Sequence, residues 1–170
     1  LFAGRLVPEK GVHFLIDAFR ATRTDLRLII AGDAPTEPAY VRSLKVRALG
    51  DPRIMFLGMV SGRKLEELFS NCYLYVQPSI VEGLSIALLE AMSYGNCCLV
   101  SDIDENREAI DDAGVVFKSQ DPQDLALRLE MMLCSPRQVE EFGEAARARV
   151  RSHYSWDVVT SLDFHGTLVS

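Results

Sequence analysis

The sequence predicts an α/β protein built around a doubly wound, parallel sheet of six strands. Short apolar runs typical of strands alternate with segments whose apolar residues recur at helical spacing, which is the pattern of βα units. The chain has 170 residues, of which 48% are apolar and 25% are charged. A globular domain has a similar length and composition. We therefore expect one domain over residues 1–170.

Six runs rich in apolar residues are predicted as the strands of this sheet. Each run is short and bounded by turn-forming residues, as buried parallel strands usually are. The runs are Leu1–Ala3, Leu26–Ala31, Ile54–Leu57, Tyr73–Gln77, Cys97–Ser101 and Gly114–Phe117. Such sheets bind ligands at the carboxyl ends of their strands, so the loops that follow these runs are candidates for a site.

Helical segments lie between and after the strands. Between Val12 and Phe19, apolar residues recur at positions i, i+3, i+4 and i+7, which places them on one face of a helix. Asp121-Pro122 is typical of a helix start, and Gly95 is typical of the left-handed residue that follows a helix. Further helices are predicted over residues 38–49, 62–69, 84–93, 121–133 and 136–154, with another from Trp156 onward.

The charge balance limits the classes of partner. Lys and Arg number 18, Asp and Glu number 24, and the formal net charge is −6. Non-specific nucleic-acid binding depends on many Lys and Arg side chains that neutralise phosphates, so we expect no nucleic-acid partner. An anionic ligand would instead be held by a few well-placed cations.

Two features bear on the compartment and on the completeness of the chain. No apolar run approaches the ~18 residues that span a bilayer, and no signal peptide precedes the first strand, although this absence says little about a longer parent protein. The expected location is cytoplasmic. The first residue is Leu1 rather than Met and lies in a strand-like run. We therefore expect the chain to be a fragment of a longer protein.

The cysteines and histidines carry no recognisable site. No C-x-x-C pair occurs among the four cysteines, which disfavours zinc and favours buried thiols in a reducing compartment. They are Cys72, Cys97, Cys98 and Cys134. No histidine has an acid or a nucleophile at the spacing of a hydrolase triad.

The loop after the first strand, Gly4–Gly11, is the first candidate site. Arg5 and Lys10 lie five residues apart on a glycine-flanked loop at the carboxyl end of a strand. A guanidinium fork and a compact ammonium both complement phosphoryl oxygens, so this loop suits a diphosphate. The alternative is a solvated loop that only starts a helix.

The segment Pro78–Met92 is the second candidate and the stronger one. Gly83 enters a predicted helix directly after a strand and loop, so the amides of Gly83, Leu84 and Ser85 would point at a ligand. A helix N-terminus of this kind binds phosphate. Glu82 would repel phosphate, so its expected partner is a hydroxyl, as on a sugar.

Glu90 adds a second acid to this segment. It lies between Leu89 and Ala91 in a mostly apolar helix, where a carboxylate needs a ligand hydroxyl or a cation. The alternative makes Glu82 a partner of the helix dipole and Glu90 the polar side of an amphipathic helix. The occurrence of both acids around one helix start favours a functional role.

The ordered set of motifs resembles the retaining glycosyltransferases of family 4, which have the GT-B fold of two Rossmann-like domains. Gly4-Arg5-Leu6 through Glu9-Lys10-Gly11 is similar to that family's G-R-L-x-x-x-K-G loop, and Glu82 and Glu90 are similar to its E-x7-E motif. The likeness runs over nearly the whole chain. Further matches are Ile30–Asp33, Phe56–Gly58, Glu90–Met92, Glu108 and Tyr154–Trp156.

The resemblance implies the C-terminal half of a GT-B fold, a Rossmann-like three-layer sandwich that binds the sugar donor. In the family, the residues that match Arg5 and Lys10 bind the donor's diphosphate, and the amides that match Gly83 and Leu84 donate to it. The match to Glu82 contacts hydroxyls of the transferred sugar, and the match to Glu90 holds the ribose. The other residues expected in the site are Gly4, Met59, Val60, Ser79 and Ser85, with Met59 and Val60 beside the base.

The implied reaction transfers a sugar, with retention at the anomeric carbon, from a nucleotide-diphosphate sugar to a hydroxyl acceptor such as a glycan or a lipid-linked sugar. The acceptor-binding domain is the N-terminal half, which this sequence lacks. The chain alone is therefore expected to be inactive, and any peripheral membrane contact would come through the absent half. No metal or other cofactor is expected, because Arg5, Lys10 and the amides at Gly83 supply positive charge.

Asp102-Ile103-Asp104 has the D-x-D spacing with which metal-dependent glycosyltransferases of a different fold bind a divalent cation. We interpret it as a pair of loop acids, since cations of the chain already face the expected diphosphate.

Three departures from the family's pattern leave every proposed ligand-binding side chain in place. Ala34 replaces a frequent second glycine, Asn96-Cys97 replaces Thr-Pro, and residues 103–107 replace a Gly-Gly loop before Glu108.

Two alternative functions remain open. One is a nucleotide-sugar epimerase of the same fold, and the other is a non-catalytic nucleotide-sugar-binding or scaffolding half of a complex.

Overall fold

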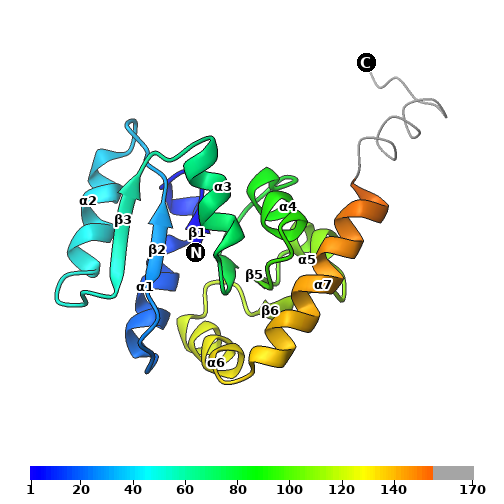
Figure 1. Ribbon diagram of the computed structural model, residues 1–170. Helices are drawn as coiled ribbons and strands as arrows, with labels where there is room; N and C mark the ends of the chain where they lie inside the picture. The colour runs from blue at the N-terminus through cyan, green and yellow to red at the C-terminus, as the bar shows by residue number, and fades with distance from the viewer. Residues whose placement is uncertain (155–170) are drawn as a thin grey trace, which may run out of the picture.

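The computed structural model describes residues 1–154, and the helix predicted from Trp156 onward lies outside them. Strands and helices alternate along the chain, as the sequence predicts (Figure 1). The strands are β1 (Phe2–Ala3), β2 (Leu28–Ala31), β3 (Ile54–Gly58), β4 (Tyr75–Gln77), β5 (Cys98–Ser101) and β6 (Val115–Phe117). The helices are the short 3-10 helix η1 (Pro8–Lys10), α1 (Val12–Ala21), α2 (Pro38–Arg47), α3 (Arg63–Ser70), α4 (Ile86–Ser93), α5 (Asp104–Ile110), α6 (Pro122–Leu133) and α7 (Pro136–His153).

All strand pairs are parallel, but they form two sheets rather than one. The strand orders are β1-β2-β3 and β4-β5-β6, so the prediction of a single six-stranded sheet is wrong. The strand β1 has only two residues, and it is linked to β4 by the Tyr75 hydroxyl, which donates to the Ala3 carbonyl at 3.4 Å, and by backbone bonds of the preceding residue, Leu1. The amide of Val76 donates to the Leu1 carbonyl at 2.9 Å, and the Leu1 nitrogen donates to the Leu74 carbonyl at 2.8 Å.

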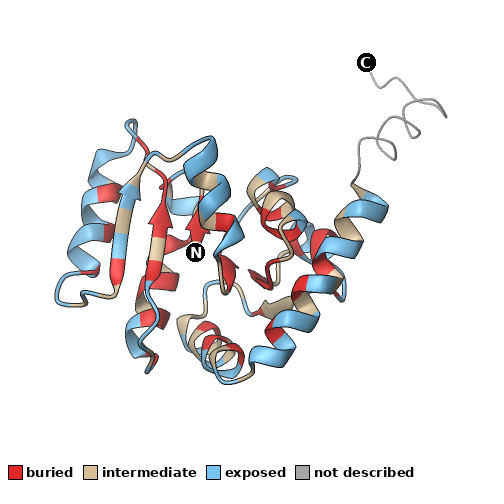
Figure 2. Ribbon diagram, in the orientation of Figure 1, coloured by how far each residue is buried: buried red, intermediate tan, exposed pale blue. Residues whose placement is uncertain are grey.

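Helices cover both faces of the two sheets, which gives three layers (Figure 1). One apolar core packs α1, α2 and α6 against strand residues such as Phe2 and Leu99. The other packs α3, α4, α5 and α7 against strand residues such as Ala3 and Cys98. Neighbouring residues of one strand thus enter opposite cores, as the two-residue period of a strand requires. Figure 2 shows buried residues concentrated in the strands and on the inner sides of helices.

Two predicted helix signals are confirmed. The Asp121 carboxylate accepts hydrogen bonds from the amides of Gln123 and Asp124 at 3.1 Å, and it thereby caps α6. After α4, Gly95 has φ +79° and its amide donates to the Met92 carbonyl at 2.9 Å. The left-handed conformation costs glycine little, and it ends the helix.

Two helix predictions are corrected. The helix α4 begins at Ile86 rather than Leu84, because the hydroxyl of Ser85 accepts from the amide of Leu88 at 3.3 Å and caps the helix there. The segment expected as a loop over residues 103–107 instead opens α5 at Asp104. Acids in the first turn of α5 favour the helix through its dipole.

The longest described helix, α7, packs against α4 and α6. A side chain at Gly143 would place its Cβ 2.2 Å from the Gly95 carbonyl oxygen, so the helix approaches the end of α4 closely. Within residues 1–154, no helix combines the length and the apolar character that crossing a membrane requires.

The thiols differ from the expectation of four buried cysteines. Cys97 and Cys98 are buried at the start of β5, and burial raises the pKa of the Cys97 thiol to about 12. Cys72 is half-buried and Cys134 is exposed. The prediction therefore fails for Cys134, which follows the last turn of α6 at the surface.

Candidate functional site

The loops after β1 and β4 meet at the carboxyl ends of these two strands. The amide of Ile80 donates to the Glu9 carbonyl at 2.7 Å. Gly11 has φ +64°, and a Cβ at this position would lie 1.9 Å from the Pro78 carbonyl oxygen. Because only glycine permits this approach, the sequence of the first loop fixes its contact with the second.

Lys10 and Glu82 form an ion pair across the two loops. The Lys10 Nζ lies 2.5 Å from the Glu82 Oε1, and the Ser79 hydroxyl donates to the same oxygen at 2.6 Å. The side chains of Lys10 and Glu82 are only 20% and 7% exposed. The Glu82 Oε2 has no hydrogen-bond partner among the described residues. This oxygen is therefore available to a ligand hydroxyl, while Lys10 and Ser79 orient the carboxylate.

Arg5 contributes a second cation beside the first loop. Its side chain is exposed and forms no ion pair with any residue from 1 to 154. Backbone contacts hold its neighbours, since the Gly4 amide donates to the Ala31 carbonyl at 3.0 Å and the Leu6 amide donates to the Asp33 carbonyl at 3.3 Å. An anchored backbone with a free guanidinium can accommodate an anion.

The tip of the second loop presents backbone donors just before α4. The amides of Gly83 and Leu84 have no hydrogen-bond acceptor in the described part of the chain. A Cβ at Gly83 would meet no atom within 4 Å, so this tip is open. The hydroxyl of Ser85 is not free, because it caps α4 and donates to Gln77 at 3.0 Å. The donors that remain for an anion are therefore the backbone amides at the positive end of α4.

Glu90 lies on α4, the helix that directly follows the second loop, and is half-buried. Burial raises the pKa of its carboxyl, and the charge of Glu66 on α3 raises it further. Its side chain forms no hydrogen bond within residues 1–154. A half-buried carboxyl without a partner is suited to accept a hydroxyl. The structure brings Lys10, Ser79 and Glu82 into contact but gives Glu90 no contact with them.

The sequence patterns did not predict a buried polar network that lies behind the second loop. The Gln77 Nε2 donates to the Asn106 Oδ1 at 3.1 Å, and the Asn106 Nδ2 donates to the Ser101 hydroxyl at 2.9 Å. The Ser101 hydroxyl donates to the Ser79 carbonyl at 2.5 Å. Gln77 and Ser101 are the last residues of β4 and β5. A polar residue at the end of each of two buried strands was the signal that could have indicated this network.

The two aspartates with D-x-D spacing are placed differently from each other. The Asp102 Oδ1 accepts from the amide of Ser119 at 2.7 Å, whereas Asp104 is exposed at the first turn of α5. Asp102 thus ties the end of β5 to the loop after β6.

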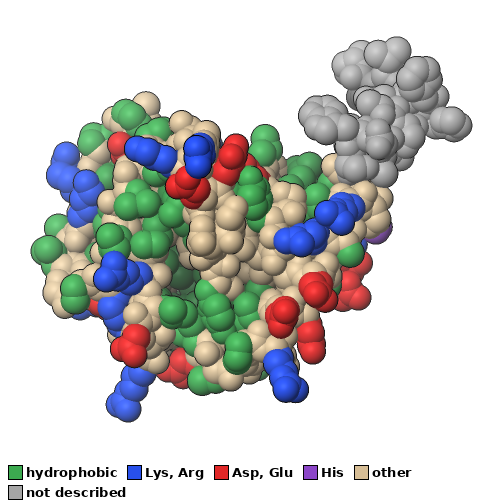
Figure 3. Space-filling model, in the orientation of Figure 1, with side chains coloured by type: hydrophobic (Ala, Val, Ile, Leu, Met, Phe, Trp, Pro, Cys, Tyr) green, Lys and Arg blue, Asp and Glu red, His purple; other side chains and the backbone are tan. Residues whose placement is uncertain are grey.

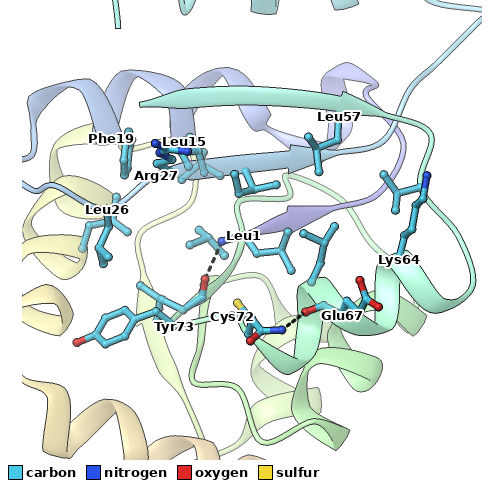
Figure 4. A pocket seen from close by; sticks show the side chains of 18 of the residues that line it. Leu1, Leu15, Phe19, Leu26, Arg27, Leu57, Lys64, Glu67, Cys72 and Tyr73 are labelled. Atoms are coloured by element: carbon cyan, nitrogen blue, oxygen red, sulfur yellow. Dashed lines mark hydrogen bonds between the residues drawn. The ribbon is translucent and has the colours of Figure 1, made fainter. Parts of the chain in front are cut away.

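An apolar cavity of about 780 Å³ lies between β2 and β4. Its wall includes Leu1, Leu57, Lys64 and Tyr73, which are among the lining side chains drawn in Figure 4. Figure 3 shows hydrophobic side chains gathered on this face of the molecule. Of the predicted site residues, Met59 and Val60 line this cavity, whereas Arg5, Lys10, Glu82 and Glu90 do not. The cavity is therefore separate from the Lys10–Glu82 pair.

The chain matches a known sequence family. The family model described as glycosyl transferases group 1 matches residues 1–149. The uncharacterized glycosyltransferase MJ1607 of Methanocaldococcus jannaschii is 30% identical over 161 residues, which cover 92% of this chain and 41% of that protein. The alpha-D-kanosaminyltransferase of Streptomyces kanamyceticus is 31% identical over 160 residues, which cover 91% of this chain and 41% of that protein. The chain thus spans less than half the length of these relatives.

Solved structures have the same fold. Anabaena Alr3699/HepE in complex with UDP superimposes with a TM-score of 0.82 at 25% identity, over 94% of this chain and 44% of that one. The catalytic domain of cholesterol-alpha-glucosyltransferase from Helicobacter pylori gives a TM-score of 0.74 at 25% identity, over 88% of this chain and 95% of that one. These similarities support a Rossmann-like α/β domain of GT-B type.

Proposed function

The chain belongs to the group 1 glycosyl transferases, and from this membership we propose that it is the donor-binding half of a two-domain enzyme. That enzyme transfers a sugar, with retention at the anomeric carbon, from a nucleotide diphosphate to a hydroxyl acceptor. The observation that carries the proposal is the meeting of Lys10, Ser79 and Glu82 between two strand-end loops. The known complex of HepE with UDP supports a nucleotide-sugar donor.

The diphosphate is assigned to the space beside Arg5, Lys10 and the tip of the second loop. The guanidinium of Arg5 is free of ion pairs with the described residues, and the amides of Gly83 and Leu84 have no described acceptor. Lys10 keeps two further N–H donors while one faces Glu82. Gly4 allows the chain to bend beside this space. The proposed donor site contains no metal or other cofactor.

The two acids are assigned to hydroxyls. Lys10 and Ser79 hold one oxygen of Glu82, and its other oxygen is assigned to the transferred sugar. Glu90 is assigned to the ribose, because its half-buried carboxyl has no described partner. The base is assigned to the region of Met59 and Val60, and Ser85 supports the loop as the cap of α4.

Catalysis then follows from charge stabilisation on the leaving group. As the bond from the sugar to the diphosphate breaks, negative charge grows on the phosphate oxygens that face Arg5, Lys10 and the two amides. A preorganised donor of this type contributes about 3–4 kcal/mol where it has been measured in an oxyanion hole. The acceptor oxygen bonds to the anomeric carbon on the face from which the diphosphate leaves, so the configuration is retained. The carbon–oxygen bond to the diphosphate breaks, and the hydroxyl proton passes to the departing phosphate oxygen.

The acceptor is assigned to the other half of the enzyme. The chain spans 41% of two relatives, which leaves room in such proteins for a second domain. The proposal includes an N-terminal acceptor domain, a glycan or lipid-linked sugar as acceptor and a cytoplasmic location. Any contact with a membrane belongs to that N-terminal half.

The test uses the full-length protein with Arg5→Ala and Glu82→Ala. Each substitution is expected to lower turnover more than tenfold, since each removes more than about 1.4 kcal/mol of transition-state stabilisation. Turnover above a tenth of the wild-type value in both variants overturns the assignment. A calorimetric panel of UDP, GDP and ADP identifies the base, and binding without any transfer would indicate a scaffold instead.

A further inference from the structure

Five buried polar residues surround the base of the loop that carries Glu82. They come from β4, from both ends of this loop, from β5 and from α5. They are Gln77, Ser79, Ser85, Ser101 and Asn106, and each is no more than 9% exposed. Burial of this many polar groups is costly unless each finds a partner.

Hydrogen bonds hold both ends of the loop through this group. At its beginning, the Ser101 hydroxyl donates to the Ser79 carbonyl at 2.5 Å. At its end, the Ser85 hydroxyl donates to the Gln77 Oε1 at 3.0 Å. Between these two attachments lie Glu82 and the open amides of Gly83 and Leu84.

Asn106 connects the two attachments. Its Oδ1 accepts from the Gln77 Nε2 at 3.1 Å, and its Nδ2 donates to the Ser101 hydroxyl at 2.9 Å and to the Ser101 carbonyl at 3.3 Å. Asn106 is 1% exposed on α5 and lies outside the loop. Without its side chain, Gln77 would keep only the bonds that its Oε1 accepts from Ser85 and Tyr75, and Ser101 would lose a buried donor. The bonds that Gln77 and Ser101 make to the loop ends would therefore be less firmly oriented.

We propose that Asn106 is a positioning residue of the donor site, which acts through Gln77 and Ser101 on the loop 78–85. It sets the position of the Glu82 carboxylate and of the Gly83 and Leu84 amides without touching the donor. This inference rests on the proposed function, because the donor is what the loop binds. An apolar filling of the same space would satisfy packing but would leave Gln77 and Ser101, which hold the two loop ends, without the partner that connects them.

The test measures nucleoside-diphosphate binding by calorimetry in the full-length protein, with whichever of UDP, GDP and ADP the wild type binds. Asn106→Ala is expected to weaken binding by about tenfold, because one disordered loop removes several donors at once. The matched control is Thr22→Val. Thr22 is also a buried polar residue, and its hydroxyl donates to the Phe19 carbonyl at the far end of α1. The control is expected to lower the melting temperature and to leave the Kd unchanged.

Hydrogen exchange gives a second readout that a general loss of stability does not reproduce. The amide of Ile80, bonded to the Glu9 carbonyl, is expected to exchange faster in Asn106→Ala and at the wild-type rate in Thr22→Val. Should Asn106→Ala fail to fold, Ser101→Ala tests the same link, since it removes only the hydroxyl between Asn106 and Ser79.

The outcomes separate this inference from the proposed function. Wild-type Kd and wild-type exchange at Ile80 in a folded Asn106→Ala or Ser101→Ala variant overturn the positioning role alone. A wild-type protein that binds none of the three nucleoside diphosphates overturns the proposed function and the positioning role together. Weaker binding with faster exchange confined to the loop supports the positioning role.

Discussion

The carboxyl ends of the two sheets are built in opposite ways. In the sheet β1-β2-β3 the strand ends carry glycines that bring backbone against backbone, and the Gly32 amide donates to the Gly58 carbonyl at 2.7 Å. In the sheet β4-β5-β6 the strand ends carry Gln77 and Ser101, whose side chains form a buried network. We call these regions the glycine end and the polar end.

The difference shows which kind of substitution each end tolerates. At the glycine end the constraint is steric, because a Cβ at Gly32 would lie 1.8 Å from the Gly4 carbonyl oxygen. At the polar end the constraint is hydrogen bonding. Each hydrogen-bond partner that is removed lowers the stability by a limited amount, so the loss is gradual. Lys10 follows the glycine end and Glu82 follows the polar end, so their ion pair joins the two regions.

The largest expected effect is that of Gly32→Ala. Its φ of +148° and the 1.8 Å approach to the Gly4 oxygen leave no room for a methyl group. We expect the free energy of unfolding to fall by more than about 4 kcal/mol, as measured by denaturant titration.

The control for this variant is Gly50→Ala. Gly50 also has a positive φ, +84°, but no atom lies within 4 Å of its Cβ position. Its cost should therefore be only the backbone penalty of about 1 to 2 kcal/mol. Equal losses in the two variants would contradict the steric account of the glycine end.

The next effect concerns the ion pair between the two ends. Lys10→Met should lower the free energy of unfolding by about 1 to 3 kcal/mol, because it leaves the nearly buried Glu82 carboxylate without its cation. Adding Glu82→Gln should recover part of that loss, so the double-mutant cycle is non-additive. The double variant is still expected to lack turnover. Additive losses in denaturation would show that the pair does not couple the two ends.

Glu90 provides a test by pH. Its pKa is raised above the ordinary value of 4.5, so the folded protein favours the neutral carboxyl. Stability from this group is therefore complete at low pH and falls as the pH rises through the raised pKa. The melting temperature of Glu90→Gln, minus that of the wild type, should increase as the pH rises above the ordinary pKa of 4.5 and level off above the raised pKa.

The exposed Glu130 on α6 supplies the control for this titration. Glu130→Gln measures the effect of removing one surface carboxylate at each pH, and the change in Glu90→Gln is compared with it. A flat difference for Glu90→Gln would mean that burial does not disfavour its charge. The same variant should bind nucleoside diphosphate more weakly, so stability and binding are expected to change in opposite directions.

The smallest effect is expected for Ser79→Ala. It removes one of two donors to the Glu82 Oε1 and leaves Lys10 in place. The free energy of unfolding should fall by about 1 kcal/mol. Turnover of the full-length enzyme should decrease less than tenfold, since the carboxylate keeps its cation. A loss as large as that of Lys10→Met would make the hydroxyl, rather than the cation, the main support of Glu82.

Local patterns in the sequence predicted most of the fold. Apolar runs and helical spacing located all six strands and most of the helices, because these elements bury the faces that the patterns mark. The helix α5 was missed, because Asp102-Ile103-Asp104 was interpreted as a pair of loop acids, whereas Asp104 and Glu105 lie in the first turn of a helix, where acids are also favourable. The division into two sheets was also not predicted, since whether the strands β1 and β4 pair depends on tertiary contacts that no local pattern specifies.

The candidate site was predictable only in its loops. Their motifs indicated that Arg5, Lys10 and Glu82 would follow strand ends, and the structure places Lys10 against Glu82. That Lys10 faces an acid of its own chain is a matter of tertiary structure. The proposed role of Asn106 likewise depends on tertiary structure. Gln77 is distant from it in the sequence, and Ser101 belongs to a different element, β5.

The contact between the two loops has a consequence for engineering donor preference. Ile80 is bonded to Glu9, and Gly11 lies against the Pro78 carbonyl with no space for a side chain. Segments 5–11 and 78–85 therefore form one structural unit in which each segment is shaped to the other. A chimera that grafts either segment alone from a relative would mismatch its counterpart, whereas exchange of both together preserves their fit.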